Sequence, residues 1–267
     1  MAKITFFQVD AFTDIPFKGN PAAVCLMEKE LPPTLLQQIA MENNLAETAF
    51  LLKATDGYNL RWFTPTVEIK LCGHATVASA HVLWEKEMLP VTETARFFTK
   101  SGLLTVTKID EWIQLNFPRF DYSKVDVHDD IIKALGITPI NSIRSGDGRF
   151  IIEVADEKEV ISLDPDFSVL KNHETVVVTS KASASLGYDF ISRSFTAAYG
   201  VNEDPVTGSS HCTLAPYWAK KLGKDKLSAY QASARGGALK LQVTDDRVLI
   251  EGKAVTVIEG VLVLNQM

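Results

Sequence analysis

The sequence predicts an α+β fold of two similar domains, related by a pseudo-two-fold axis, each with a mostly antiparallel sheet and one main helix. Three observations lead to this prediction. Residues 57–80 and 187–215 resemble each other in the order of their turns, strands and helix. Most predicted strands are joined as hairpins, and each half holds one main helix. This pattern favours α+β over a parallel α/β sheet.

The resemblance between the two halves keeps a constant register. Four residues of the first copy recur 135 positions later in the second copy: Glu68, Gly73, Gly102 and Asp110. A repeat of this kind predicts two similar domains, which we place at 1–117 and 128–267, with the linker near 118–130. We leave open whether the last strand packs on the N-terminal domain. Residues 57–117 are expected to superpose on 187–252.

The individual elements follow from local patterns. Residues 4–9 predict a first strand, and the loop at 14–20 leads into a second one. A helix is predicted over 32–44, because apolar residues have helical spacing between a proline and an asparagine. "TAFLL" at 48–52 predicts a short buried strand. Glycine-led hairpins are predicted at 101–117 and 236–252.

The composition limits the classes of partner. The chain has 267 residues, 46% apolar and 22% charged, which is typical of a soluble globular protein. A net charge of −6 without a basic stripe argues against a nucleic-acid partner. No apolar run is long enough to span a membrane, and the N-terminus does not resemble a signal peptide. Three cysteines far apart in the sequence indicate no disulfide framework, so we expect a cytoplasmic protein.

The segment "EDPVTGSSHCTLAP" at 203–216 contains an expected helix start. Gly73 and Gly208 are both predicted at helix starts, where unpaired N–H groups and the helix dipole favour an anion. The alternative for Asp204 and Ser209 is ordinary N-capping. Pro216 is expected to kink the second helix, and "SGDGRF" at 145–150 is interpreted as a hairpin turn.

Four motifs carry a resemblance to a known family, in the right order and across nearly the whole chain. They are "FTDIPFKGNPAAVCL", "ETAFL", "FTPTVEIKLCGHAT" and "NEDPVTGSS". Together they resemble the phenazine-biosynthesis PhzF-like isomerases, which share their fold with diaminopimelate epimerase. The resemblance implies that each domain is a curved sheet wrapped around a central helix. It also implies a cofactor-independent active site between the domains.

The resemblance implies that Glu47 is the general acid/base that moves a proton between carbons. A carboxyl group in a dry cleft suits this role, although an isolated glutamate is more often a surface residue. His74 would bind substrate in its neutral form, because a helix N-terminus disfavours the imidazolium. The alternative is a packed histidine.

The remaining site residues would bind and orient the substrate. Asp204, kept extended by the proline that follows it, would orient an amine or hydroxyl. Gly73, Gly208 and Ser209 would bind the carboxylate. The expected partner is therefore a small carboxylated substrate, with no cofactor and no metal. A homodimer is left open.

Cys72 leaves a second function open, a thiol-assisted racemase or epimerase. The matching position of the second half holds Thr207, and Cys212 lies inside the helix, so a two-thiol mechanism is disfavoured. Cys72 alone is more typical of a small packed residue. A third alternative is a non-catalytic ligand-binding or interaction protein, against which the presence of Glu47 argues.

Overall fold

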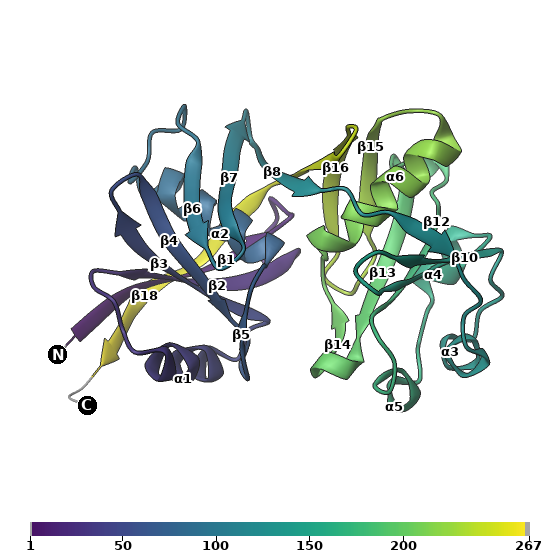
Figure 1. The fold of residues 1–267 in the computed structure, drawn as a ribbon, viewed down its shortest axis with the longest axis horizontal. Coiled ribbons are helices and arrows are strands. Elements are labelled where there is room, and N and C mark those ends of the chain that lie inside the picture. The colour runs from purple at the N-terminus through teal and green to yellow at the C-terminus, as the bar shows by residue number, and fades with distance from the viewer. Residues whose placement is uncertain (1, 265–267) are drawn as a thin grey trace. The chain divides into compact units, whose positions relative to one another are not determined.

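The computed structural model describes residues 2–264, and the chain divides into two compact units. Unit 1 comprises 1–116 and 251–267, and unit 2 comprises 117–250. The second unit therefore differs from the predicted range of 128–267. The last strand, β18 (Ala254–Leu264), lies in unit 1 because it pairs antiparallel with β1 (Ala2–Ala11) along its whole length (Figure 1).

Unit 1 is a mostly antiparallel sheet with two helices. Its other elements are β2 (Asn20–Met27), α1 (Pro33–Asn43), β3 (Glu47–Ala54), β4 (Gly57–Phe63), β5 (Glu68–Ile69), α2 (Gly73–Glu85), β6 (Ala95–Thr99), β7 (Gly102–Ile109) and β8 (Trp112–Pro118). The strand order is β18, β1, β2, β3, β4, β6, β7 and β8, with β5 also paired to β4. Only the β2–β3 and β4–β6 pairs are parallel.

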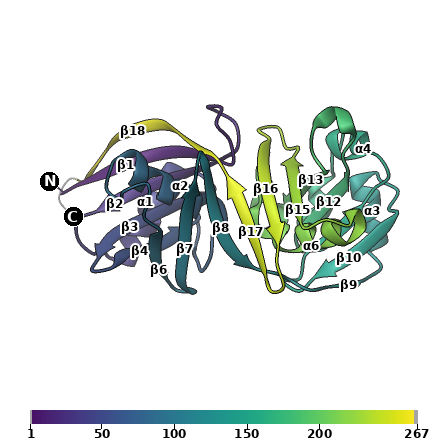
Figure 2. The same cartoon turned by 90° about the horizontal axis from the view of Figure 1, so that it is seen from above.

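The two helices of unit 1 follow from their sequences. Helix α1 buries Leu36, Ile39 and Ala40, and it ends at Asn44, which adopts the left-handed conformation. Helix α2 consists mainly of alanine, valine and other small or apolar residues, and it is buried almost all round. It packs against β1, β2, β3 and β18, so it is the central helix of the unit (Figure 2).

Unit 2 has the same plan. Its elements are β9 (Tyr122–Lys124), α3 (Asp129–Leu135), β10 (Asn141–Ser145), β11 (Phe150–Glu153), α4 (Glu157–Ile161), α5 (Phe167–Leu170), β12 (Val176–Lys181), β13 (Phe190–Thr196), β14 (Val201–Asp204), α6 (His211–Leu222), β15 (Lys226–Gln231), β16 (Gly237–Val243) and β17 (Arg247–Gly252), with 3-10 turns at Ala184–Leu186, Ala197–Tyr199 and Gly208–Ser210. The predicted linker is partly wrong, because β9 lies within it and pairs with β10.

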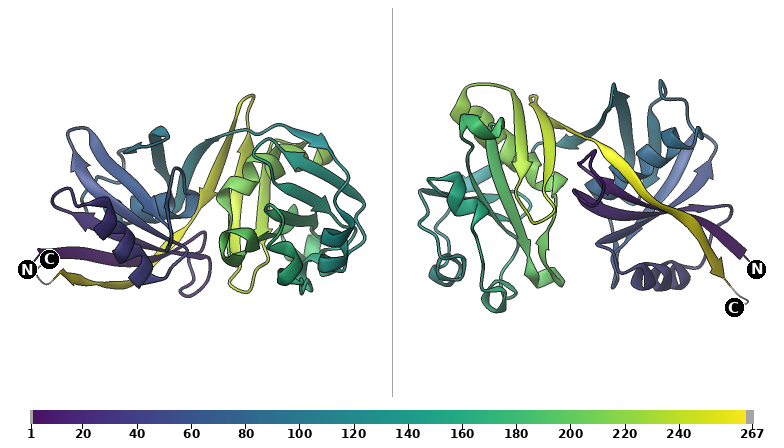
Figure 3. Two further views of the ribbon diagram at one scale, coloured as in Figure 1. Left: turned by 60° about the horizontal axis from the view of Figure 1, so that its bottom comes forward. Right: turned by 180° about the vertical axis from the view of Figure 1, so that it is seen from behind.

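The pairing pattern of unit 2 repeats that of unit 1. The strand order is β9, β10, β11, β12, β13, β15 and β16, with β14 also paired to β13. The parallel pairs are β11–β12 and β13–β15, the counterparts of β2–β3 and β4–β6. Helices α3, α4 and α5 cover an apolar cluster on this sheet, and α6 packs against β15 and β16 (Figure 3). The predicted α+β class is confirmed.

The repeat extends to side-chain contacts. In unit 1, Arg61 binds both carboxylate oxygens of Glu68, at 2.8 and 2.9 Å, and stacks over Phe63. In unit 2, Arg193 binds both oxygens of Glu203, at 2.7 and 2.8 Å, and stacks over Phe195. Each pair joins the long strand to its short hairpin partner. The two stretches that look alike in sequence therefore have the same local packing.

Pro216 lies inside α6, and the structure explains how the helix accommodates it. Proline has no N–H to donate to the carbonyl four residues earlier, which is that of Cys212. That carbonyl instead accepts a bond from the backbone N–H of Phe120, at 3.0 Å. The helix runs from His211 to Leu222 across the proline. No helix among residues 2–264 is long and apolar enough to cross a membrane.

Candidate active site

Glu47 is the first residue of β3, directly after the turn that ends α1. The bond from the Asn43 amide to the Thr48 hydroxyl, at 3.1 Å, ties this turn to the strand. In the parallel β2–β3 pair, Glu47 lies opposite Ala22, two residues after Asn20. The Glu47 side chain is 17% exposed. The fold therefore places this carboxylate at a strand entry that is mostly shielded from water.

His74 is the second residue of α2, and its ring faces Glu47. The His74 Nε2 atom lies 3.0 Å from the Glu47 Oε2 atom, and the two side chains are 7% and 17% exposed. The two atoms are at ion-pair distance, but neither makes a hydrogen bond of ordinary geometry to a described residue. Both are buried polar atoms without such a partner among residues 2–264.

The other ring nitrogen of His74 has two neighbours. The Nδ1 atom lies 3.2 Å from the side-chain nitrogen of Asn20 and 3.6 Å from the sulfur of Cys72. Asn20 is fully buried at the start of β2. Three segments that are far apart in the sequence, at 20, 47 and 72–74, thus converge on one imidazole ring.

The surroundings of His74 act on its charge in opposite directions. Burial disfavours the imidazolium, but Cys72 and the Glu47 carboxylate favour it, and the net effect raises the pKa of His74 well above 6.5. A carboxylate 3.0 Å from the ring outweighs the helix dipole, whose effect is about 1 kcal/mol. The direction of this pKa shift favours a protonated ring beside Glu47, whereas the Asn20 side-chain nitrogen at Nδ1 can donate only to an unprotonated ring nitrogen.

Cys72 is the residue before α2 and is 6% exposed. Burial, and to a smaller extent the nearby Glu47 carboxylate, raise the pKa of the Cys72 thiol above its usual value. A thiol with a raised pKa is a weaker nucleophile and base at neutral pH, because the thiolate is the reactive form. This environment favours the packed role for Cys72.

Glu47, Cys72 and His74 also bring three potential metal ligands within 4.8 Å of one another, which sequence reasoning missed. The imidazole lies between the other two groups, because Cys72 approaches Nδ1 and Glu47 approaches Nε2. A histidine normally gives one nitrogen to an ion, so these three side chains would have to rearrange to share a metal. The observed geometry fits an ion pair better than a preformed metal site.

Asp204, at the end of β14, belongs to a hydrogen-bonded loop in unit 2. Its carboxylate accepts a bond from the Thr207 hydroxyl at 2.5 Å, and its carbonyl accepts one from the Gln231 amide at 2.7 Å. Gln231, which is fully buried on β15, also accepts a bond from the Thr207 N–H at 2.8 Å. Gln231 therefore fixes both ends of the loop that carries Asp204.

Gly208 begins a 3-10 turn, Gly208–Ser210, and not the α-helix itself. The α-helix begins at His211, because the Ser210 N–H bonds to the carbonyl three residues earlier, that of Thr207. At Gly73, the predicted helix start is correct. The residues that precede these two helical turns, Thr207 and Ser210, make no side-chain capping bond.

Ser209 has a cationic neighbour that the sequence did not indicate. The Arg149 Nη2 atom donates a hydrogen bond to the Ser209 hydroxyl oxygen at 2.8 Å. Arg149 comes from the hairpin between β10 and β11, which the sequence suggested was only a turn. Arg149 and Ser209 are 60 positions apart, so no local pattern predicts their contact. The glycine-rich "SGDGRF" motif was the only sequence signal in this segment.

His211 is a second buried histidine, and its pKa is shifted in the opposite direction from that of His74. Its Nδ1 atom lies 2.9 Å from the Thr207 carbonyl oxygen, so it donates a proton there. Burial lowers the pKa of His211 to about 4. The pKa values of the two histidines shift in opposite directions because His74 has a carboxylate nearby, whereas His211 lies near the cationic Arg149.

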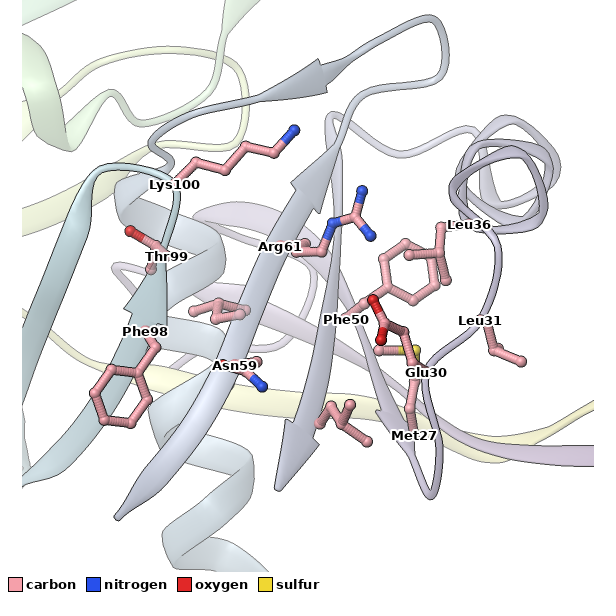
Figure 4. Close-up of a pocket in the computed structure, with 12 residues that line it drawn as sticks. Met27, Glu30, Leu31, Leu36, Phe50, Asn59, Arg61, Phe98, Thr99 and Lys100 are labelled. Atoms are coloured by element: carbon pink, nitrogen blue, oxygen red, sulfur yellow. The ribbon is translucent and has the colours of Figure 1, made fainter. Parts of the chain in front are cut away.

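One cavity of about 330 Å³ in unit 1 does not include these residues. Figure 4 shows Arg61 between Lys100 on one side and the apolar Phe50 and Leu36 on the other. Arg61 and Lys100 both pair with Glu68, and the Arg61 pair is the one repeated in unit 2. A repeated ion pair indicates a structural role, so we place the candidate active site at Glu47 and His74.

A sequence model of the phenazine biosynthesis-like proteins matches residues 9–260 of this chain. The chain belongs to the phenazine biosynthesis-like, or PhzF, family. It is 49% identical to an uncharacterized isomerase of Halalkalibacterium halodurans, over 99% of this chain and all of that one. A PhzF-family crystal structure from Enterococcus faecalis covers 98% of this chain and 100% of its own, with a TM-score of 0.93 and 42% identity.

Structures with lower sequence identity show the fold alone. A predicted epimerase of Pseudomonas aeruginosa has a TM-score of 0.75 at 17% identity, covering 98% of this chain and all of its own. The family therefore confirms the predicted resemblance. Three relatives in this family, 44–49% identical to the chain, are named as uncharacterized isomerases.

Proposed function

We propose that this PhzF-family protein is an isomerase that moves a proton at carbon of a small carboxylated substrate, with Glu47 as the general acid/base. The observation that supports this most directly is the buried pair of Glu47 and His74, 3.0 Å apart. A mostly buried carboxylate beside an imidazole ring, with an oxygen that accepts no ordinary hydrogen bond from residues 2–264, has a lone pair available to accept a proton from a substrate.

In the proposed reaction, Glu47 takes a proton from a carbon, and the electron pair that remains is delocalised into the substrate's unsaturated or carboxyl group. The protonated Glu47 then returns the proton to another carbon, or to the other face of the same carbon. Atoms and charge balance within the substrate, so the net reaction is an isomerisation. The His74 imidazolium would stabilise the negative charge that develops in between.

Unit 2 offers groups of its own that would bind and orient a carboxylated substrate. Asp204 would accept a bond from an amine or hydroxyl, while Ser209 and the N–H groups near Gly208 would bind the carboxylate. The N–H groups at the start of α2, beginning at Gly73, would contribute in the same way, because no side chain caps this helix. These roles come from the family resemblance and from the donors described above.

Thiol-assisted racemisation by Cys72 is less well supported. The Cys72 sulfur is close to His74, but the pKa of the thiol is raised, and the chain has Thr207 at the corresponding position in unit 2. A non-catalytic binding protein would not need a buried carboxylate beside a cationic histidine. We therefore favour Glu47 as the acid/base.

The direct test is a screen for exchange at carbon. Mixtures of metabolite carboxylates would be incubated with the protein in deuterated water, and deuterium gain would be followed by mass spectrometry and proton NMR. We expect one class of carboxylate to gain deuterium at carbon with the wild type and with Glu42→Gln, an exposed control. Glu47→Gln should not catalyse this exchange. Equal exchange by Glu47→Gln would refute the proposal.

A further inference from the structure

The hairpin between β10 and β11 is fixed against the start of α6. The Ser145 hydroxyl lies 2.6 Å from that of Thr213, on α6, and both side chains are buried. The hairpin is closed by the Ser145 N–H, which donates to the Arg149 carbonyl at 2.9 Å. The Gly146 N–H donates to the Asp121 carbonyl at 2.8 Å. The backbone that carries Arg149 is therefore held in place on both sides.

The Arg149 guanidinium is only partly satisfied. Its Nη2 atom donates to the Ser209 hydroxyl at 2.8 Å and lies 3.2 Å from an Asp147 carboxylate oxygen. The side chain is 21% exposed. The Nη1 atom is buried and donates to no group among residues 2–264. A buried donor without an acceptor costs free energy, and more so on a charged group.

The hydrogen bond from Arg149 also determines how the Ser209 hydroxyl can act. Its oxygen accepts the hydrogen bond from Arg149, so its own hydrogen is left to be donated. No group in the described part of the chain accepts it. Two neighbouring residues thus present two unused donors, one of them on a guanidinium. Guanidinium groups bind carboxylates well, because their hydrogen bonds are charge-assisted and match the planar oxygens.

We propose that Arg149 and Ser209 together bind a carboxylate of the substrate, and that Arg149 makes the protein select carboxylates over the corresponding amides. This inference rests on the proposed function at one point, because it takes Ser209 to be a residue that binds the substrate. A singly charged carboxylate fits better than phosphate, because the Asp147 carboxylate close to the guanidinium would repel a dianion. The substrate would therefore be a carboxylate whose neutral analogues bind weakly.

The test compares three probes by saturation-transfer NMR and calorimetry: benzoate, its neutral analogue benzamide, and inorganic phosphate. We expect the wild type to prefer benzoate to both other probes. Arg149→Gln should weaken benzoate binding about ten-fold or more and leave benzamide unchanged. Arg149→Lys keeps the charge but loses the planar geometry, so it should be intermediate.

Arg144→Gln is the matched control. Arg144 lies on the same hairpin, but it pairs with Glu174 at the surface. This variant should bind benzoate like the wild type, and Ser209→Ala supplies a second disruptive variant should Arg149→Gln fail to fold. A wild type without preference for benzoate, or equal loss in the Arg144 control, would overturn the inference, as would tighter binding of phosphate than of benzoate.

The result separates this inference from the proposed function. A benzoate preference that depends on Arg149, without any deuterium exchange in the metabolite screen, would support the carboxylate site and refute the isomerase. Deuterium exchange that depends on Glu47, together with unchanged benzoate binding by Arg149→Gln, would refute the role of Arg149 alone.

Discussion

The Nε2 atom of His74 lies 3.0 Å from a carboxylate oxygen of Glu47, in a part of unit 1 where both side chains are mostly buried. Each residue stands at the start of its element, Glu47 at β3 and His74 at α2. Asn20 and Cys72 approach the other nitrogen of the same ring. This arrangement holds a carboxylate and an imidazole ring together where water is largely excluded, which strengthens their electrostatic interaction.

Glu47→Gln should abolish proton transfer but preserve substrate binding. The amide has nearly the shape of the carboxyl but accepts no proton, so we expect turnover to fall by roughly 10²–10⁴-fold with little change in affinity. Steady-state kinetics and calorimetry would measure the two effects, with Glu42→Gln as the control. Turnover close to that of the wild type would show that another residue is the base.

Asp204→Ala and Ser209→Ala should weaken substrate binding as well as turnover. Asp204 is held by Thr207 and Gln231, and Ser209 is held by Arg149, so each presents a fixed polar group to the substrate. Removing one hydrogen bond to a charged group is expected to weaken binding about ten-fold or more. Calorimetric titration with the substrate found in the exchange screen would measure this. Changes confined to turnover, with unaltered affinity, would contradict the binding role.

Cys72→Ala should retain most of the turnover. The raised pKa of the Cys72 thiol leaves little thiolate at neutral pH, so its loss should affect packing more than chemistry. The wild-type Cys72 should also react slowly with iodoacetamide at pH 7, as followed by mass spectrometry of the modified peptide. Loss of turnover in Cys72→Ala, with full turnover in Glu47→Gln, would identify the thiol as the base.

The stability of the protein should depend on the ionisation of His74. Its pKa is raised above 6.5 in the folded protein, so the stabilisation is fully present below about pH 6.5 and is lost as the pH rises through the folded-state pKa. Urea unfolding at several pH values should therefore show a fall above pH 6.5 that His74→Gln reduces.

His211 provides the internal comparison for this measurement. Proton NMR of the ring signals should show His74 titrating above pH 6.5, while His211, whose pKa is about 4, stays neutral throughout the neutral range. A His74 ring that titrates below 6.5 would contradict the ion pair with Glu47.

Arg193→Met should destabilise the protein more than Arg61→Met. The two arginines make equivalent bidentate pairs, but Arg193 also donates to the carbonyl of Leu163, two residues after α4 ends, at 2.7 Å. Its loss leaves an additional partly buried acceptor unsatisfied, which is expected to cost about 1–3 kcal/mol more. Urea unfolding of the two variants would measure the difference. Equal losses would show that the Leu163 contact contributes nothing.

The sequence by itself determined the fold class, the internal repeat and much of the candidate site. Helix α1 could be predicted because its apolar spacing, proline and terminal asparagine are local signals. The repeat was visible because both copies keep an arginine on the long strand and a glutamate on the short one. The family motifs indicated Glu47, His74, Asp204 and Ser209, whose roles stay predictions.

Only the tertiary structure decided which residues surround these groups and what charge they carry. Asn20, Arg149 and Gln231 lie 54, 60 and 24 positions from the residues they contact, so no local pattern indicates the contacts. The contact between His74 and Glu47 was not predicted, because helix position is readable from the sequence whereas a carboxylate 3.0 Å away is not. Electrostatic interactions depend on distance in space and on burial, and both are set by packing between segments that are remote in the chain.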